Sequence, residues 1–230
     1  NEGCGSTHLE KVRSSVAEHG AEIGFAFDGD GDRMLAVDSE GREFDGDEIV
    51  ALAALHLQEA GELRGGAAVT VMSNVGFHQA MDRAGVEVAT TKVGDRYVIE
   101  ELVERDWTIG GEQSGHIIWT DFATTGDGLA AALLVMRALG DGRLADADPM
   151  EKLPQRLENV AVPSREALNA ATGLWEAVGR ENARLDGRGR VLVRPSGTEP
   201  LVRVMVEAPE ESECEEILAR LVAEAKEALG

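Results

Sequence analysis

Short apolar runs alternate with helix-length segments through the first 140 residues, and this alternation constrains the fold more than any other feature. The runs at residues 23–27, 67–72 and 86–90 have the length and composition of buried strands. Between and after them, the periodicity predicts helices at residues 8–19, 47–60, 77–84, 96–105 and 129–139, and Asp47 is the expected N-cap of the second. Strands that alternate with helices form α/β layers. We therefore expect an α/β fold.

The composition changes after the last of these helices. Residues 140–158 contain several glycines and prolines and many charges, which is typical of a domain boundary. Beyond this boundary, one helix is predicted at residues 164–182 and an amphipathic helix at residues 210–229. Two strands, at residues 189–193 and 201–207, lie between them in the sequence. No internal repeat is evident.

Charge excludes several classes of partner. The 230 residues contain 22 Lys and Arg and 43 Asp and Glu, so the formal net charge is −21. This charge argues against nucleic acid and against an anionic membrane surface as partners. Cys4 and Cys214 lie far apart without metal-type spacing, which favours a reducing, cytoplasmic compartment. The chain begins at Asn1 without an initiator methionine, which suggests a piece of a longer protein.

The loop that follows the first apolar run contains three alternating carboxylates. Asp28, Asp30 and Asp32 are separated by glycines, whose conformational freedom lets such a loop curl around a hard cation. An EF-hand loop would need glycine at its sixth position and glutamate at its twelfth, and Arg33 and Ser39 stand there instead. The pattern indicates a Mg²⁺ site, and an acidic turn without a ligand is the alternative.

A second polar loop, residues 110–116, contains Glu112, Ser114 and His116 at alternate positions. In an extended loop these side chains would point to one side and suit the hydroxyl groups of a sugar. An ordinary polar surface loop would look similar, so this signal is weak by itself.

A third loop, residues 194–200, is an anion-binding candidate. Arg194 and Arg203 flank Ser196, Gly197 and Thr198, and together these offer charge, hydroxyl groups and backbone N–H groups. In a protein with so many acidic residues, these two arginines form a local cluster of positive charge. A hairpin turn with solvated arginines is the alternative. Together, the metal and anion loops indicate metal-assisted phosphoryl chemistry on a small molecule.

These three loops, in this order, resemble the α-D-phosphohexomutase superfamily. The resemblance also includes residues 92–98 (KVGDRYV) and 124–128 (TTGDG), and it spans nearly the whole chain. Gln113 and residues 92–98 are similar to the branch of the superfamily that acts on glucosamine phosphate. The resemblance implies three parts: residues 1–44 as the end of one α/β domain, residues 45–150 as a complete three-layer α/β domain, and residues 151–230 as a C-terminal α+β domain with a mainly antiparallel sheet.

The resemblance also implies roles for individual residues. Asp28, Asp30 and Asp32 would hold Mg²⁺. Catalytic positions would be Arg33, Lys92 and His116, with Arg33 steadying the transferred group and the other two serving in proton transfer or orientation. The substrate-binding positions implied are Glu112, Ser114, Arg96, Arg194, Ser196, Gly197, Thr198 and Arg203.

One part of the family's pattern is missing. The family's nucleophile is a phosphorylated serine in a Ser-His-Asn-Pro type segment, and this chain has only Ser73-Asn74, in another context. The resemblance therefore implies a fragment that needs the N-terminal domains of the same enzyme and takes a hexosamine phosphate as substrate. The alternatives are a phosphomannomutase or phosphoglucomutase and a non-catalytic sugar-phosphate binding module. The sequence leaves open whether the protein forms a homodimer.

Overall fold

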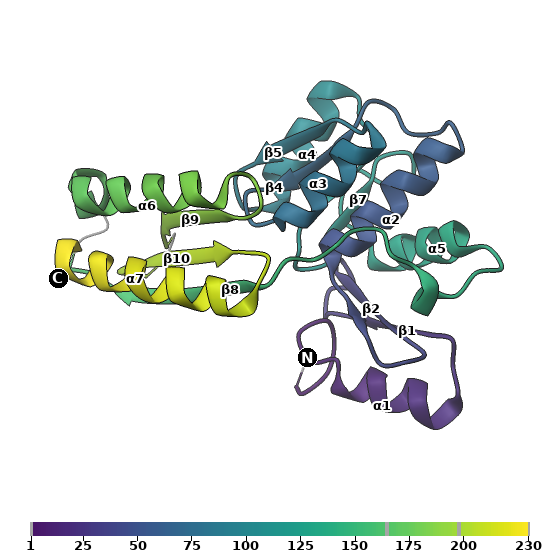
Figure 1. Ribbon diagram of the computed structural model, residues 1–230. Coiled ribbons are helices and arrows are strands. Elements are labelled where there is room, and N and C mark those ends of the chain that lie inside the picture. Colours follow the sequence, from purple (N-terminus) through teal and green to yellow (C-terminus); the bar gives the residue numbers. More distant parts are fainter. Residues whose placement is uncertain (1, 164–165, 197–198, 230) are drawn as a thin grey trace. The chain divides into compact units, whose positions relative to one another are not determined.

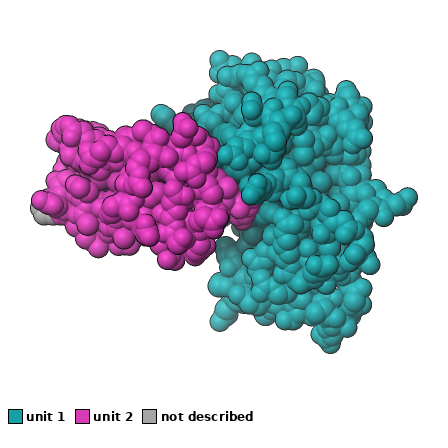
Figure 2. All heavy atoms as spheres, viewed as in Figure 1, with its two compact units in different colours: residues 1–151 teal, residues 152–230 magenta. Residues whose placement is uncertain are grey.

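The computed structural model describes residues 2–163, 166–196 and 199–229 and divides the chain into two compact units. Unit 1 comprises Asn1–Glu151 and unit 2 comprises Lys152–Gly230 (Figure 2). Each unit has its own hydrophobic core and is described by itself. In the described part of the chain, no helix is both long enough and apolar enough to span a membrane.

The larger sheet of unit 1 has the strand order β5-β4-β6-β7. Its strands are β4 (Ala67–Thr70), β5 (Val88–Thr91), β6 (Ile109–Gly111) and β7 (Ile117–Trp119). Strand β4 pairs in parallel with β5 and β6, and β7 is antiparallel to β6. Two separate apolar clusters pack against this sheet. Helices α2 (Gly46–Glu59), α3 (Val75–Ala84) and α5 (Gly128–Leu139) contribute to one, and α4 (Asp95–Arg105) contributes to the other.

A second, smaller sheet in unit 1 carries the carboxylate-rich loop. It contains β1 (Ile23–Phe27), β2 (Met34–Asp38) and β3 (Glu43–Phe44), in that order and antiparallel. Figure 1 shows β1 and β2 side by side. Helix α1 (Glu10–His19) packs against β1 and β2. The contact is close because Gly24 of β1 lies directly beneath Val12 and Val16 of the helix.

Unit 2 is a two-layer α+β domain. Its sheet has the order β8-β10-β9, formed by β8 (Gln155–Ala161), β9 (Arg190–Pro195) and β10 (Leu201–Glu207), and both pairings are antiparallel. Helices α6 (Thr172–Leu185) and α7 (Glu211–Leu229) share one apolar cluster with the sheet. On the central strand, Val202, Val204 and Val206 are fully buried in that cluster, as the two-residue period of a strand requires.

The α/β class predicted from the sequence is confirmed, and several details differ. Strands β3, β6, β7 and β8 were not predicted, because the first three are short and β8 is mostly exposed and polar. The predicted helix at residues 164–182 begins instead at Thr172, after a 3-10 helix at Glu166–Ala170. A second 3-10 helix covers Leu144–Asp146.

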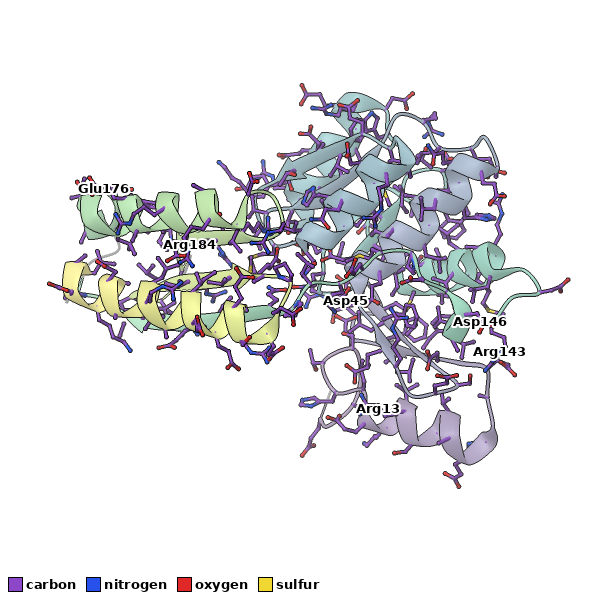
Figure 3. All side chains as sticks on the ribbon, in the orientation of Figure 1. Arg13, Asp45, Arg143, Asp146, Glu176 and Arg184 are labelled. Atoms are coloured by element: carbon purple, nitrogen blue, oxygen red, sulfur yellow. The ribbon has the colours of Figure 1, made fainter. Side chains whose placement is uncertain are left out.

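The start of α2 also differs from the expectation. Asp47 was expected to cap this helix, but Asp45 does so, two residues earlier (labelled in Figure 3). The Asp45 side chain accepts from the N–H groups of Asp47 and Glu48, and the Glu48 carboxylate accepts from the Asp45 N–H. This reciprocal arrangement is a capping box.

Candidate functional site

The carboxylate-rich loop connects β1 to β2. The Asp28 carboxylate accepts from the N–H groups of Gly31 and Arg33 at 3.1 and 3.2 Å. Burial opposes ionisation of Asp28, but these N–H groups, the Asp32 carboxyl and the Arg33 charge outweigh it and hold the pKa of Asp28 below 3.8. Asp30 is exposed. The loop therefore keeps at least one carboxylate ionised at neutral pH.

These carboxylates do not form a ready-made cluster. Among the described residues, no group of three or more His, Cys, Asp or Glu side chains is arranged to hold a metal ion. The chemistry of the donors nevertheless fits a hard cation, since Asp28 and Asp32 belong to one short loop and carboxylate oxygens are the ligands that Mg²⁺ prefers.

His116 lies at the centre of unit 1's candidate site. Its side chain is 4% exposed, and its Nδ1 lies 3.2 Å from Asp32 Oδ2 of the carboxylate loop. Its Nε2 is buried, has no hydrogen-bond partner in the described structure and lies 3.9 Å from Asp95 Oδ2. A side chain at Gly126 would collide with the ring, at 2.3 Å from Nε2. The histidine thus contacts three other segments that the sequence analysis had singled out.

Backbone contacts join the same segments. Arg33 and His116 form an antiparallel bridge, and the Met34 N–H donates to the Gly115 carbonyl at 2.9 Å. The Gly128 N–H, at the start of α5, donates to the Gly31 carbonyl at 2.9 Å. The carboxylate loop, residues 112–116 and residues 124–128 therefore form one continuous site within unit 1.

The second polar loop differs from its predicted shape. Gly110 and Gly111 belong to β6, and residues 112–115 form a tight turn closed by the Gly115 N–H on the Glu112 carbonyl. The prediction of an extended loop with Glu112, Ser114 and His116 on one side was therefore wrong. Glu112 is half-buried, Ser114 exposed and His116 buried. The Glu112 carboxylate accepts from the Gly94 N–H at 2.9 Å, which orients it.

Lys92 and Arg96 lie on the exposed side of the same region. Lys92 Nζ stands 5.8 Å from the centre of the Tyr97 ring, and no described contact joins it to His116. The Arg96 side chain is 80% exposed and pairs with Glu100 one turn along α4. Both are free to move toward a ligand. The sequence analysis included Gly94, Asp95 and Gly126 in the segments that carry the resemblance, but it assigned none of the three a role in the site.

In unit 2, Arg194 of β9 and Arg203 of β10 stand directly opposite each other in the antiparallel register. Burial and the facing charge of Arg203 lower the pKa of the Arg194 guanidinium. The nearest carboxylate to Arg203 is Glu199, at 3.8 Å. Among the described residues, no carboxylate forms an ion pair with Arg194. Like charges facing each other across a strand pair are destabilising, so this pair favours an anion beside it.

Ser196 follows β9 and lies at the start of the connecting loop. It is 2% exposed, and its hydroxyl accepts from the Glu199 N–H at 3.3 Å. Gly197 and Thr198, the remaining predicted members of this loop, lie outside the described residues. The structure thus brings Arg194, Arg203 and Ser196 to one end of the β9–β10 hairpin.

Comparison with known proteins decides the family. Residues 45–157 match the model of phosphoglucomutase/phosphomannomutase, alpha/beta/alpha domain III, and residues 157–224 match the model of the C-terminal domain of the same family. The chain belongs to the phosphohexomutase family. This confirms the resemblance inferred from the loops.

Individual relatives cover the whole chain but are longer. A phosphoglucosamine mutase of Streptomyces avermitilis is 52% identical over 100% of this chain and 52% of its own length. One of Desulforudis audaxviator is 50% identical over 96% of this chain and 50% of its own. The chain thus spans about half the length of these phosphohexomutases. Since its matched models are domain III and the C-terminal domain, it corresponds to their C-terminal portion.

Solved structures agree on the fold. The N-acetylphosphoglucosamine mutase of Aspergillus fumigatus, in complex with GlcNAc-6P and magnesium, has a TM-score of 0.80. It is 23% identical, and the match covers 99% of this chain and 53% of that one. A phosphoglucomutase/phosphomannomutase family protein of Burkholderia thailandensis has a TM-score of 0.73 at 24% identity, with 97% and 50% of the chains covered.

Proposed function

We propose that this chain is the C-terminal portion of a phosphoglucosamine mutase. The complete enzyme would interconvert glucosamine 6-phosphate and glucosamine 1-phosphate through a phosphoserine enzyme and a 1,6-bisphosphate intermediate. Relatives of this name, at 50–52% identity, support the assignment. Within it, residues 1–44 would complete a domain begun upstream, residues 45–150 would form the third domain and residues 151–230 the fourth.

The observation that carries this proposal is the facing pair Arg194 and Arg203 on neighbouring strands. Two half-buried guanidinium groups with little local compensation suit the phosphate of the substrate that is not being transferred. Ser196 would add a hydroxyl, and Gly197 and Thr198 would complete the cradle. A phosphate group should bind tightly here, because its negative charge offsets the repulsion between the two arginines.

Asp28, Asp30 and Asp32 would hold Mg²⁺. The ion would supply charge neutralisation for the phosphoryl group when bound. The chain's own groups prepare for this role: two N–H groups fix the Asp28 carboxylate, and His116 fixes Asp32. Arg33, 44% exposed, is placed beside the loop where its guanidinium can steady a transferring phosphoryl group.

The sugar would be recognised by the turn at residues 112–116. One carboxylate oxygen of Glu112 accepts from the Gly94 N–H, and this hydrogen bond fixes the orientation of the carboxylate. The other oxygen would then accept from a sugar hydroxyl. Ser114 and Arg96 are exposed, and their side chains would contact the ligand. His116 serves best in orientation, because its ring is buried, whereas exposed Lys92 has the freedom that proton transfer needs.

Two other functions fit parts of the site. A phosphomannomutase or phosphoglucomutase would use the same metal and phosphate loops, and Gln113 with residues 92–98 favours the glucosamine branch. A non-catalytic sugar-phosphate binding module would need the cradle and the turn but no serine. Titration of the chain with glucosamine, glucose and mannose 6-phosphates separates the mutases from one another, since they differ in the sugar that they bind. Turnover by the chain joined to an N-terminal half of the family separates a mutase from a binding module.

The proposed partners are a hexosamine phosphate and the N-terminal domains of the same enzyme, in a cytoplasmic setting that two free cysteines favour. A homodimer is a separate hypothesis, which sedimentation of the chain tests.

Calorimetry of the 230-residue chain tests the phosphate site. Arg194→Ala or Arg203→Ala removes a charge-assisted contact of about 1.5–3 kcal/mol, so glucosamine 6-phosphate should bind roughly tenfold to a hundredfold more weakly. Binding of unphosphorylated glucosamine should hardly change. Arg184→Ala is the control, since Arg184 lies on α6 and pairs with Glu181. Equal losses for both ligands would mean that the loop is not a phosphate site.

A further inference from the structure

Helices α2 and α5 begin in the same way. In each, an aspartate caps the helix and a glycine is the first helical residue: Asp45 and Gly46 in α2, Asp127 and Gly128 in α5. Asp127 accepts from the Ala130 N–H at 2.9 Å, as Asp45 does from the N–H groups of its own first turn. Glycine is a poor helix former, so two such starts in one unit need a physical reason.

Backbone conformation is not that reason. Both glycines are buried, and neither Gly46 nor Gly128 has the positive φ that glycine adopts more readily than other residues. Alanine would therefore fit the backbone at either position and would normally stabilise the helix. What excludes alanine is the space around the two Cα atoms.

Gly46 lies directly against the turn at residues 112–116. A Cβ atom at Gly46 would stand 1.9 Å from the Glu112 carbonyl oxygen and 2.8 Å from the Gly115 nitrogen. The N–H groups of a first helical turn have no partner within the helix, and that of Gly46 donates to the Gln113 carbonyl at 3.0 Å. The backbone of this turn therefore rests on the first residue of α2.

Gly128 has the same relationship to the carboxylate loop. A Cβ atom at Gly128 would stand 2.9 Å from the carbonyl oxygens of Gly31 and Arg33 and from Cδ1 of the Phe27 ring. Carbon atoms in contact normally lie about 3.5–4.0 Å apart, so the loop would have to move. The Gly128 N–H donates to the Gly31 carbonyl at 2.9 Å.

The two helices form one packed body beneath these segments. Helices α2 and α5 contact each other and contribute to the same apolar cluster. Because protein interiors are close-packed, neither helix can shift freely to relieve a collision at its first residue. The facing segment therefore has to move instead, and it moves relative to the other segment.

We propose that Gly46 and Gly128 are positioning residues of the candidate site. Gly46 fixes the turn at residues 112–116, and Gly128 fixes the carboxylate loop, because the missing side chain lets each helix start donate to the backbone in front of it. Neither glycine touches the sugar or the ion. The ligands assigned to the two segments rest on the proposed function, whereas the backbone contacts do not.

Amide hydrogen exchange of the 230-residue chain tests these contacts without a ligand. The amides at positions 46 and 128 have no helical partner, so their protection reports the bond to the facing carbonyl. Both should be protected in the parent chain. Gly46→Ala should lower protection at position 46 on the order of tenfold and change position 128 little, and Gly128→Ala should do the reverse.

Other positions provide the controls. Gly66→Ala would also meet a backbone oxygen, that of Glu87 at 2.0 Å, but Gly66 precedes β4, whereas the turn follows the carboxyl end of parallel strand β6. It should lower the melting temperature and leave both amides protected. Gly173→Ala, in the open first turn of α6, should change neither property. If the glycine variants do not fold, Asp45→Ala and Asp127→Ala loosen the same helix starts more mildly and should give the same crossed pattern.

Calorimetry adds a readout that general destabilisation would not produce. Gly46→Ala should weaken binding of glucosamine 6-phosphate more than that of Mg²⁺, and Gly128→Ala should weaken that of Mg²⁺ more. Binding of inorganic phosphate to unit 2 should hardly change in either variant.

The outcomes separate this inference from the proposed function. A parent chain that binds neither glucosamine 6-phosphate nor Mg²⁺ would contradict the proposed function, and the exchange pattern alone would then decide the inference. Unprotected amides at positions 46 and 128 of the parent chain, or equal losses at both positions in each glycine variant, would overturn the inference. Equal weakening of both ligands in each variant of a parent chain that binds them would overturn it too.

Discussion

His116 Nδ1 lies 3.2 Å from Asp32 Oδ2, so one contact joins the turn after β6 to the carboxylate loop after β1. The two residues are 84 positions apart in the sequence. Because the histidine ring is almost fully buried and the carboxylate is one-third exposed, the ring is the fixed partner and the carboxylate is the one positioned. The turn at residues 112–116 and the carboxylate loop are therefore held together by a direct side-chain contact.

Replacing this histidine should affect both stability and metal binding. His116→Ala removes a buried ring and leaves a cavity, so the free energy of unfolding of unit 1 should fall by about 2 kcal/mol. Mg²⁺ should bind more weakly because Asp32 loses its orientation. Urea unfolding and calorimetry measure the two effects. The control His19→Ala lies on the exposed end of α1 and should change neither; a His116→Ala variant that binds Mg²⁺ as well as the parent chain would contradict the coupling.

The carboxylate loop itself should bind Mg²⁺ weakly in this chain. In the proposed site, Asp28, Asp30 and Asp32 would supply three ligands, and the family's phosphoserine, which would add another, is not in this sequence. Asp30→Ala should reduce Mg²⁺ binding, while Asp141→Ala, at an exposed position outside the loop, should not. Calorimetry that shows the same Mg²⁺ binding for Asp30→Ala and the parent chain would contradict the assignment of this loop as a Mg²⁺ site.

For the facing arginines of unit 2, we expect a substitution that does not lower the melting temperature, although most substitutions do. Removing one charge of the Arg194–Arg203 pair relieves repulsion, so Arg194→Met should leave the melting temperature unchanged or raise it in phosphate-free buffer. The same variant should lose most of the stabilisation that added inorganic phosphate gives the parent chain. Thermal unfolding with and without phosphate measures both. An ordinary structural arginine would show the reverse: a lower melting temperature and an unchanged phosphate effect.

The two cysteines should react at very different rates. Cys214 on α7 is fully buried, and its Sγ donates to the Val206 carbonyl at 3.0 Å. Burial raises the pKa of this thiol above its ordinary 9.0, so at pH 8 only half-buried Cys4 should react rapidly with a thiol reagent. Cys4→Ser should abolish the fast phase; a fast phase that survives would show that Cys214 is accessible.

The same raised pKa predicts a pH dependence of stability. The folded state favours the protonated thiol, so its contribution is fully present below pH 9 and is lost as the pH rises through the folded-state pKa. The free energy of unfolding of unit 2 should therefore fall above pH 9 in the parent chain. The fall should be smaller in Cys214→Ala, which has no thiol to ionise.

The sequence analysis identified the loops that carry the candidate site residues, but it did not predict the conformation of those loops. Alternating apolar runs and helical periods were enough for the α/β class, because burial patterns are local. The cap of α2 was misplaced by two residues, since Asp45 and Asp47 are chemically alike and only the reciprocal bond from Glu48 distinguishes them. The extended form of residues 112–116 was wrong because a turn closed by Gly115 looks like any polar loop in sequence.

Other features were invisible because they depend on contacts between distant segments. Nothing in the sequence places Gly94 beside Glu112, or Gly126 against the His116 ring. The exposure of β1 was likewise hidden, because its apolar residues predict a buried strand, yet four of its five residues are only half-buried.

The last prediction is that the 230-residue chain binds its substrate without converting it. In this family, the resemblance implies, phosphoryl transfer needs a donor serine in line with the sugar hydroxyl, and such positioning supplies much of the reduction in the barrier. Ser114 and Ser196 belong to the binding loops, and Ser73 is fully buried. Purified chain with Mg²⁺, a bisphosphate primer and glucosamine 6-phosphate should give no glucosamine 1-phosphate. A fusion that places the N-terminal half of the Streptomyces avermitilis relative before Asn1 should give product. In the fusion, Arg194→Ala should reduce turnover and Arg184→Ala should not. Product formed by the chain alone would show that one of its own residues acts as the donor, and the assignment of the nucleophile to the N-terminal portion would then be wrong.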